Sequence, residues 1–284
     1  MLKQRVVTGV IMAAIVLAAI FYLPSPIFIL IAALIVSIGA WEWSRLASYE
    51  GVARYLFVFV FAVILGIIFW FSGLASSVLS SSDAELLKDN TLAIVFIASL
   101  WWLVALFLVK QYPAASGLWS KQWQQTIIGV LVLLPTWASL VFLRLQEQGQ
   151  WLIVVLIMCV VCADTGAYFF GRKWGRNKLA ASVSPGKSKE GFYGGLFTSI
   201  VFAIILIFSL GVEANNWWLL LLIVVASLAS VLGDLVESMF KRQRGIKDSG
   251  AILPGHGGVL DRLDSLTAAA PIFVLLYILS GWRL

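Results

Sequence analysis

Charge is scarce in this sequence, and so are cysteine and histidine. Only 12% of the 284 residues are charged, 61% are hydrophobic, and the chain contains one histidine and two cysteines. No soluble domain has enough interior to bury that much apolar surface. The two cysteines, Cys159 and Cys162, lie inside an apolar run, which excludes a disulfide framework and favours a packing role over a redox motif. The composition therefore predicts a chain surrounded mostly by lipid.

The apolar runs are about 20 residues long and lack the two-residue alternation of a membrane β-barrel, which favours transmembrane helices. We predict an all-α, polytopic helix bundle that forms a single integral membrane domain over residues 1–284. Nine spans are expected, at 6–23, 26–43, 55–73, 91–109, 126–143, 151–170, 191–211, 216–234 and 266–282.

Basic residues indicate the orientation of this bundle. With a cytoplasmic N-terminus, all but three of the 20 lysines and arginines fall in cytoplasmic segments, the exceptions being Lys88, Arg144 and Arg283. This bias predicts a cytoplasmic N-terminus and a periplasmic C-terminus in a bacterial inner membrane. The net charge of +6 is spread over short juxtamembrane loops, so we expect membrane lipids and phosphorylated substrates as partners and no nucleic acid.

Two cytoplasmic connections, about 171–191 and 234–265, are rich in Gly, Ser, Lys and Arg and are the expected active segments. Their basic side chains could hold a polyphosphate, although some of them only mark the cytoplasmic side. These side chains are Lys187, Lys189, Lys241, Arg242, Arg244, Lys247 and Arg262.

Carboxylates border the same segments, inside or at the ends of apolar spans, where a charge is costly and suggests a function. Asp164 falls late in the sixth predicted span, and Asp234 is expected to end the eighth. Asp261 and Asp264 are three residues apart, so on a helix they share a face. One isolated aspartate could equally cap a helix or pair with an arginine. The cluster predicts a site for a hard cation such as Mg²⁺.

The single histidine, His256, is flanked by three glycines, which allow backbone amides to approach an anion closely. Two other motifs are excluded. Gly186, Lys187 and Ser188 imitate the end of a P-loop, but Ala181 stands where its first glycine is required. A nucleophilic triad is not indicated, because no nucleophile elbow accompanies the histidine.

From Ser238 to Asp264, the sequence SMFKRQRGIKDSGAILPGHGGVLDRLD resembles the signature of the phosphatidate cytidylyltransferase (CDP-diacylglycerol synthase) family without a departure. The stretch from Asp164 to Gly191 looks like a second motif block of that family, and the resemblance covers essentially the whole chain. It implies an integral membrane, divalent-cation-dependent transferase that acts as a homodimer.

The reaction that the resemblance implies joins phosphatidate to the cytidylyl group of CTP and releases pyrophosphate. Because the attacking phosphate is already an anion, the site has to supply positioning and charge neutralisation. The implied cofactor is Mg²⁺, as one or two divalent cations, with a monovalent cation as a further candidate. The candidate metal ligands are Asp164, Asp234, Asp261 and Asp264. The candidate catalytic residues are Asp261, Asp264, His256 and Lys247. The candidate substrate-binding residues are Lys187, Ser188, Ser238, Lys241, Arg242 and Arg262.

Three alternatives are distinguishable. A CTP-dependent polyprenol kinase would attack the γ-phosphorus and release CDP instead of pyrophosphate. A secondary transporter would also carry membrane aspartates, but no inverted repeat is visible and the polar residues collect at one interface. A CDP-alcohol phosphotransferase is disfavoured, because its aspartate array begins with Asp-Gly and no aspartate here precedes a glycine.

Overall fold

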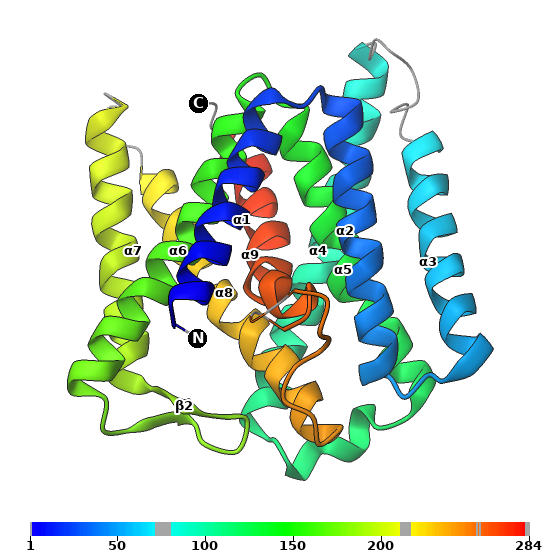
Figure 1. The fold of residues 1–284 in the computed structure, drawn as a ribbon. Coiled ribbons are helices and arrows are strands. Elements are labelled where there is room, and N and C mark those ends of the chain that lie inside the picture. The colour runs from blue at the N-terminus through cyan, green and yellow to red at the C-terminus, as the bar shows by residue number, and fades with distance from the viewer. Residues whose placement is uncertain (1, 72–80, 211–216, 254, 256, 282–284) are drawn as a thin grey trace.

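The computed structural model describes residues 2–71, 81–210, 217–253, 255 and 257–281. In these ranges the chain forms a bundle of long helices with a short hairpin at one end (Figure 1). The helices are α1 (Leu2–Tyr22), α2 (Ser25–Leu46), α3 (Gly51–Phe71), α4 (Ser81–Lys110), the 3₁₀ helix η1 (Ala114–Trp119), α5 (Gln122–Arg144), α6 (Gly149–Trp174), α7 (Lys189–Ser209), α8 (Trp217–Gln243) and α9 (Leu260–Ser280). The strands are β1 (Lys178–Ala180) and β2 (Ser184–Ser188).

The length and composition of the helices agree with the predicted membrane bundle. In the described part of the chain, the eight helices α2 to α9 are long and apolar enough to cross a membrane, and α1 adds a shorter apolar stretch, Val7–Tyr22. Large apolar side chains are exposed on the outer faces of many helices, as they are where lipid is the solvent. The prediction of an all-α, polytopic fold is confirmed, and the first of the nine predicted spans, 6–23, corresponds to the shorter apolar stretch of α1.

The helix α9 runs through the interior of the bundle and contacts α2, α4, α5, α6 and α8, whereas α3 packs chiefly against α2 at the edge (Figure 1). Buried aromatic rings join elements that are distant in sequence. The ring centroid of Phe240 lies 4.8 Å from that of Trp43 and 4.5 Å from that of Trp119. These contacts fix α2, α8 and η1 to one another near the end that carries the hairpin.

Small residues bring two pairs of helices unusually close. A side chain at Gly195 of α7 would lie 2.6 Å from the carbonyl oxygen of Ala163 on α6. A side chain at Gly233 of α8 would overlap the carbonyl oxygen of Asp264 on α9. Close backbone approach of this kind is typical of membrane helix interfaces. At Gly233 it places α8 and α9 together at the level of the predicted carboxylates.

The connection 175–188 contains the hairpin, which the sequence did not predict. β1 and β2 pair antiparallel, with Lys178 opposite Ser188 and Ala180 opposite Ser184. At the base of the hairpin, Glu190 accepts hydrogen bonds from the backbone amides of Arg176 and Asn177 at 3.1 and 3.2 Å. Strands this short carry little hydrophobic alternation, so periodicity alone could not reveal them.

The expected position of Asp234 at the end of the eighth span is wrong, because α8 continues to Gln243. The helix α9 likewise begins at Leu260, earlier than the predicted 266. A hydropathy window ends where charges begin, but these helices continue because their polar side chains face neighbouring helices inside the protein. Glu237 and Ser238, for example, are buried.

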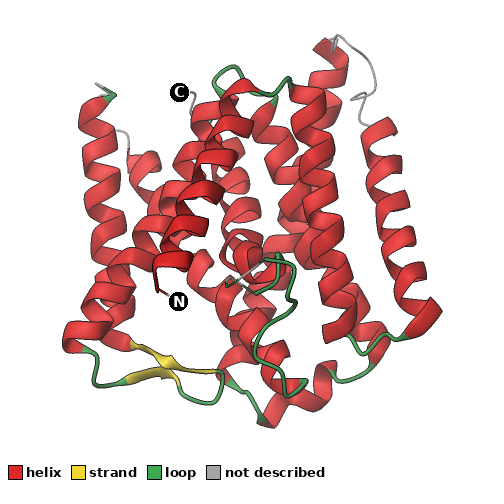
Figure 2. Cartoon of the chain, viewed as in Figure 1, coloured by secondary structure: helices red, strands yellow, loops and turns green. Residues whose placement is uncertain are grey.

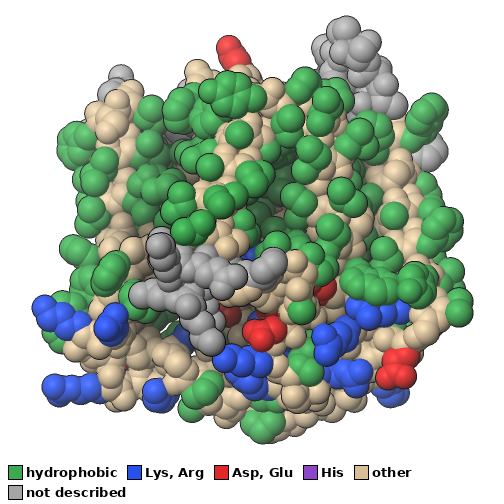
Figure 3. Space-filling model, viewed as in Figure 1, with side chains coloured by type: hydrophobic (Ala, Val, Ile, Leu, Met, Phe, Trp, Pro, Cys, Tyr) green, Lys and Arg blue, Asp and Glu red, His purple; other side chains and the backbone are tan. Residues whose placement is uncertain are grey.

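One end of the bundle is polar. The hairpin lies at this end, and the connection from α8 to α9 starts there and rises into the bundle (Figure 2). In the space-filling view, lysine and arginine side chains gather along the same end, and hydrophobic side chains cover the surface above them (Figure 3). We call this the polar end.

Candidate active site

The four predicted aspartates lie toward the polar end on three helices. Asp164 lies on α6, Asp234 on α8, and Asp261 and Asp264 at the start of α9. Asp234 is close enough to interact electrostatically with both Asp164 and Asp264. The structure thus brings Asp234 near both Asp164 and Asp264, whereas Asp261 forms its hydrogen bonds with other partners.

Lys187, at the end of β2, reaches across to Asp234 on α8. The distance from Lys187 Nζ to Asp234 Oδ2 is 2.6 Å, and about a quarter of each side chain is exposed (25% and 28%). One turn further along α8, the hydroxyl of Ser238 donates to Asp234 Oδ1 at 3.2 Å. The hairpin therefore places the ammonium group of Lys187 next to the carboxylate of Asp234.

A cavity of about 360 Å³ opens beside this ion pair, between α6, α7 and the hairpin. Its lining includes Asp164, Arg172, Lys187 and Ser188. A second cavity of about 500 Å³ is lined mainly by apolar side chains of α4, α8 and the hairpin, and it shares Leu179 with the first. A charged chamber and an apolar chamber thus adjoin the same hairpin.

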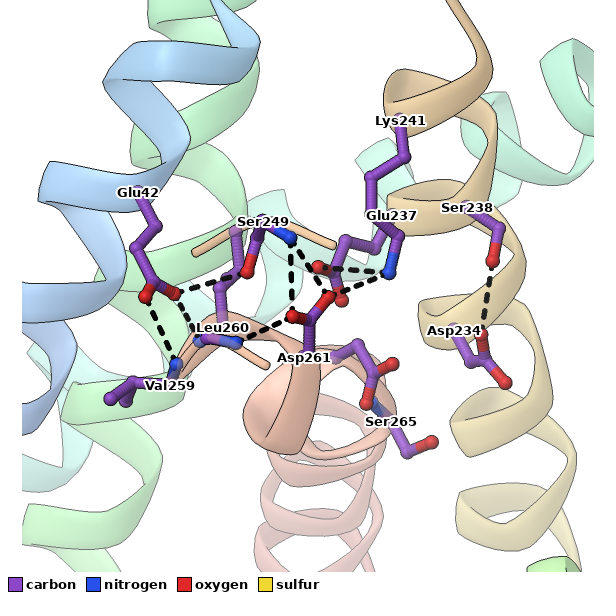
Figure 4. A network of polar contacts seen from close by, with 12 residues as sticks. Glu42, Asp234, Glu237, Ser238, Lys241, Ser249, Val259, Leu260, Asp261 and Ser265 are labelled. Carbon is purple, nitrogen blue, oxygen red and sulfur yellow. Dashed lines mark hydrogen bonds and ion pairs between the residues drawn. The ribbon is translucent and has the colours of Figure 1, made fainter. Parts of the chain in front are cut away.

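Asp261 is buried and surrounded by donors (Figure 4). Its Oδ1 accepts from Lys241 Nζ at 2.8 Å, and its Oδ2 accepts from the backbone amides of Gly258 at 2.7 Å and Ser249 at 3.1 Å. The amide of Gly258 precedes α9, so Asp261 satisfies a donor at the helix N-terminus while it neutralises Lys241. Its predicted role as a metal ligand remains a prediction.

Lys241 serves two carboxylates at once. Its Nζ lies 3.3 Å from Glu237 Oε1, in addition to its contact with Asp261. Glu237 is only 3% exposed and was not predicted as a site residue. The sequence could have indicated Glu237 through its position four residues before Lys241, because residues at this spacing on a helix are neighbours. The group of two carboxylates and one lysine lies near Asp264, whose Oδ1 accepts from the Ser265 amide at 2.8 Å.

Asp164, Asp234 and Asp264 offer only carboxylate oxygens, which are the ligands that hard cations prefer. A bound cation would also offset the repulsion between their negative charges. In the part of the chain that the structure describes, no three His, Cys, Asp or Glu side chains form a ready metal-binding group. Mg²⁺ usually binds one or two carboxylates and takes its other ligands from water and substrate phosphates. The carboxylates suit such a partly open site.

Other predicted residues have mainly structural contacts. The hydroxyl of Ser188 accepts from the Gly191 amide at 3.1 Å and caps α7. Arg242 Nε donates to the carbonyl oxygen of Val183 at 3.2 Å and so holds the hairpin turn. Arg262 and Lys247 are exposed at the polar end, available to a ligand. His256 lies outside the described residues.

Sequence reasoning also missed Glu42, a buried carboxylate of α2 (Figure 4). It accepts hydrogen bonds from the Ser249 hydroxyl and from the backbone amides of Val259 and Leu260. The sequence could have indicated Glu42, because it is a charged residue inside a predicted apolar span. The same reasoning identified the aspartates.

Comparisons with known proteins agree over the length of the chain. A family model described as the cytidylyltransferase family matches residues 3–280. The phosphatidate cytidylyltransferase of Pseudomonas aeruginosa is 43% identical over 286 residues, with 99% of each chain covered. That of Haemophilus influenzae is 40% identical over 288 residues, covering 98% of this chain and 99% of the relative. That of Staphylococcus haemolyticus is 34% identical over 220 residues, covering 68% and 84%.

Proposed function

This chain belongs to the cytidylyltransferase family, and we propose that it joins phosphatidate to the cytidylyl group of CTP, forming CDP-diacylglycerol and pyrophosphate. The observation that carries this proposal from the structure is the ion pair between Asp234 and Lys187, a residue that lines the charged cavity. This pair supports the proposal because a lysine that could bind phosphate lies beside carboxylates that suit a metal, and a reaction between two phosphate groups requires both.

The chemistry asks for little beyond orientation and charge balance. A phosphate oxygen of phosphatidate attacks the α-phosphorus of CTP, the bond to the bridging oxygen breaks, and pyrophosphate leaves. Lys187 and Arg172 line the cavity and would hold the triphosphate, while exposed Arg262 would approach it from α9. No side-chain nucleophile is needed, so we propose a single displacement. Chirally labelled CTP should then show inversion at the α-phosphorus, and retention would contradict this mechanism.

Mg²⁺ is the proposed cofactor, as one or two divalent cations with a monovalent cation as a further candidate. Asp234 and Asp264 would hold it, with Asp164 as a helper, and Asp261 would fix Lys241 beside them. When bound, the metal would neutralise the charge that develops on the leaving group.

The proposed active side is the cytoplasmic side of the bacterial inner membrane. The gathering of lysine and arginine at the polar end supports this orientation by the positive-inside rule (Figure 3). A homodimer is also proposed, on the family resemblance, and native mass spectrometry in detergent would test it.

One assay tests the function. The purified protein, given CTP, phosphatidate and Mg²⁺, should release pyrophosphate and form a lipid that carries cytidine. Release of CDP with a newly phosphorylated lipid would indicate a kinase of the polyprenol type, and neither product would contradict both enzymes.

A further inference from the structure

Glu42 is buried in α2, far in sequence from both active segments. Its exposed fraction is 1%, and its hydrogen-bond donors belong to the loop before α9 and to the start of α9 (Figure 4). A carboxylate removed from water is strongly destabilising unless hydrogen-bond donors compensate it. It accepts hydrogen bonds from three donors, all within residues 249–260.

The backbone at the start of α9 divides its donors between two carboxylates. The amide of Gly258 donates to Asp261, whereas those of Val259 and Leu260 donate to Glu42 at 3.1 and 2.7 Å. The first amides of a helix have no partner within the helix and carry partial positive charge. Glu42 therefore binds the N-terminus of α9 from outside and fixes its place against α2.

Ser249 connects the two carboxylates directly. Its hydroxyl donates to Glu42 at 3.1 Å, and its amide donates to Asp261 at 3.1 Å. The loop fits tightly around this contact, because a methyl group at Gly250 or at Gly258 would overlap a carboxylate oxygen of Glu42. A displacement of Glu42 would thus move the donors that hold Asp261.

We propose that Glu42 is a positioning residue for cytidylyl transfer, holding the α8–α9 connection and the start of α9 so that Asp261, Lys241 and Asp264 keep their places. The proposal rests on the proposed function. Glu42 itself touches neither the charged cavity lining nor Asp234, and it acts through Ser249 and the α9 backbone.

The test begins with Glu42→Gln, which keeps the shape but turns an amide NH₂ toward donors. We expect kcat/KM to fall at least 10-fold, and Glu42→Asp to recover part of the loss because it keeps the charge. Gly250→Ala should cause a similar loss with Glu42 intact. The controls are Glu50→Gln, at an exposed carboxylate, and Gly117→Ala, where a methyl group meets nothing within 4 Å.

Hydrogen exchange supplies a readout that does not depend on activity. In Glu42→Gln, the amides of residues 249–262 should exchange faster, while those of α6 and α7 keep wild-type protection. Wild-type activity, or faster exchange throughout with unchanged activity per folded molecule, would overturn the proposal. If Glu42→Gln does not fold, Gly250→Ala and Glu42→Asp decide by the same two measurements. If the wild-type protein forms no cytidine lipid, the proposed function fails, and the exchange experiment still decides whether Glu42 holds the loop.

Discussion

Lys187 and Asp234 neutralise each other across the gap between the hairpin and α8. If the ammonium binds the triphosphate, Lys187→Gln should lower kcat/KM by about 10- to 100-fold, in line with the worth of a charge-assisted hydrogen bond. The melting temperature should change little, because a partly exposed ion pair contributes about 0–1 kcal/mol. Steady-state kinetics and thermal unfolding measure the two effects. Lys178→Gln, an exposed lysine of the same hairpin, is the matched control, and an equal loss there would argue against a specific role.

Substitution of the two aspartates at the start of α9 should affect stability and Mg²⁺ dependence differently. Asp261→Asn removes the partner of Lys241 and an acceptor for two amides, so it should abolish turnover and destabilise the fold by about 1–3 kcal/mol. Asp264→Asn should also remove most activity but keep the stability and raise the Mg²⁺ concentration needed for half-maximal rate. Unchanged Mg²⁺ dependence in Asp264→Asn would contradict its assignment as a metal ligand.

At the scale of elements, the contact of α8 with α9 depends on Gly233. Gly233→Ala would push a methyl group against the carbonyl oxygen of Asp264, and we expect a loss of about 1–3 kcal/mol, as for other overpacked sites. Activity should fall with it, because the two helices carry opposing carboxylates. Gly66→Ala on α3, where nothing lies within 4 Å, should be neutral, which thermal unfolding of both variants can check. Equal stability of both variants would contradict the close packing.

The sequence was sufficient for the helices but not for their polar ends. Apolar runs gave the positions of the spans because the bilayer demands about 20 such residues. The continuation of α8 through Glu237 and Lys241 was missed, since a composition window registers their charges but not that Lys241 pairs with Glu237 and with Asp261 on α9. The hairpin was missed because Glu190 holds its base at Arg176 and Asn177 and Arg242 holds its turn at Val183, contacts that no periodicity records.

The candidate site, too, was predicted from the sequence only in part. Four aspartates, Asp164, Asp234, Asp261 and Asp264, were predicted as a group because each charge is costly in lipid unless it has a function. In the structure Asp234 is near Asp164 and Asp264, whereas Asp261 pairs with Lys241. Glu42 escaped the prediction although the same cost applies to it. It stands apart from both active segments in sequence, and only the fold brings residues 249–260 to it.

At the scale of the whole molecule, the charge distribution predicts the side on which CTP is used. Lysine and arginine collect at the polar end, so that end should face the cytoplasm (Figure 3). Inside-out vesicles should turn over added CTP, and sealed right-side-out vesicles should do so only after permeabilisation. Equal rates in both preparations would overturn the orientation.

The hydrogen bonds of Glu42 also impose an order on how the protein is built. Its partners lie 207 to 218 residues further along the chain. Because synthesis proceeds from the N-terminus, α2 reaches the membrane long before these donors are made. Until then the Glu42 carboxylate has none of them, so it should stay near the water interface. The connection before α9 and the start of α9 therefore complete α2, so a chain truncated before residue 249 would lack more than a helix: it would leave the Glu42 carboxylate without these donors.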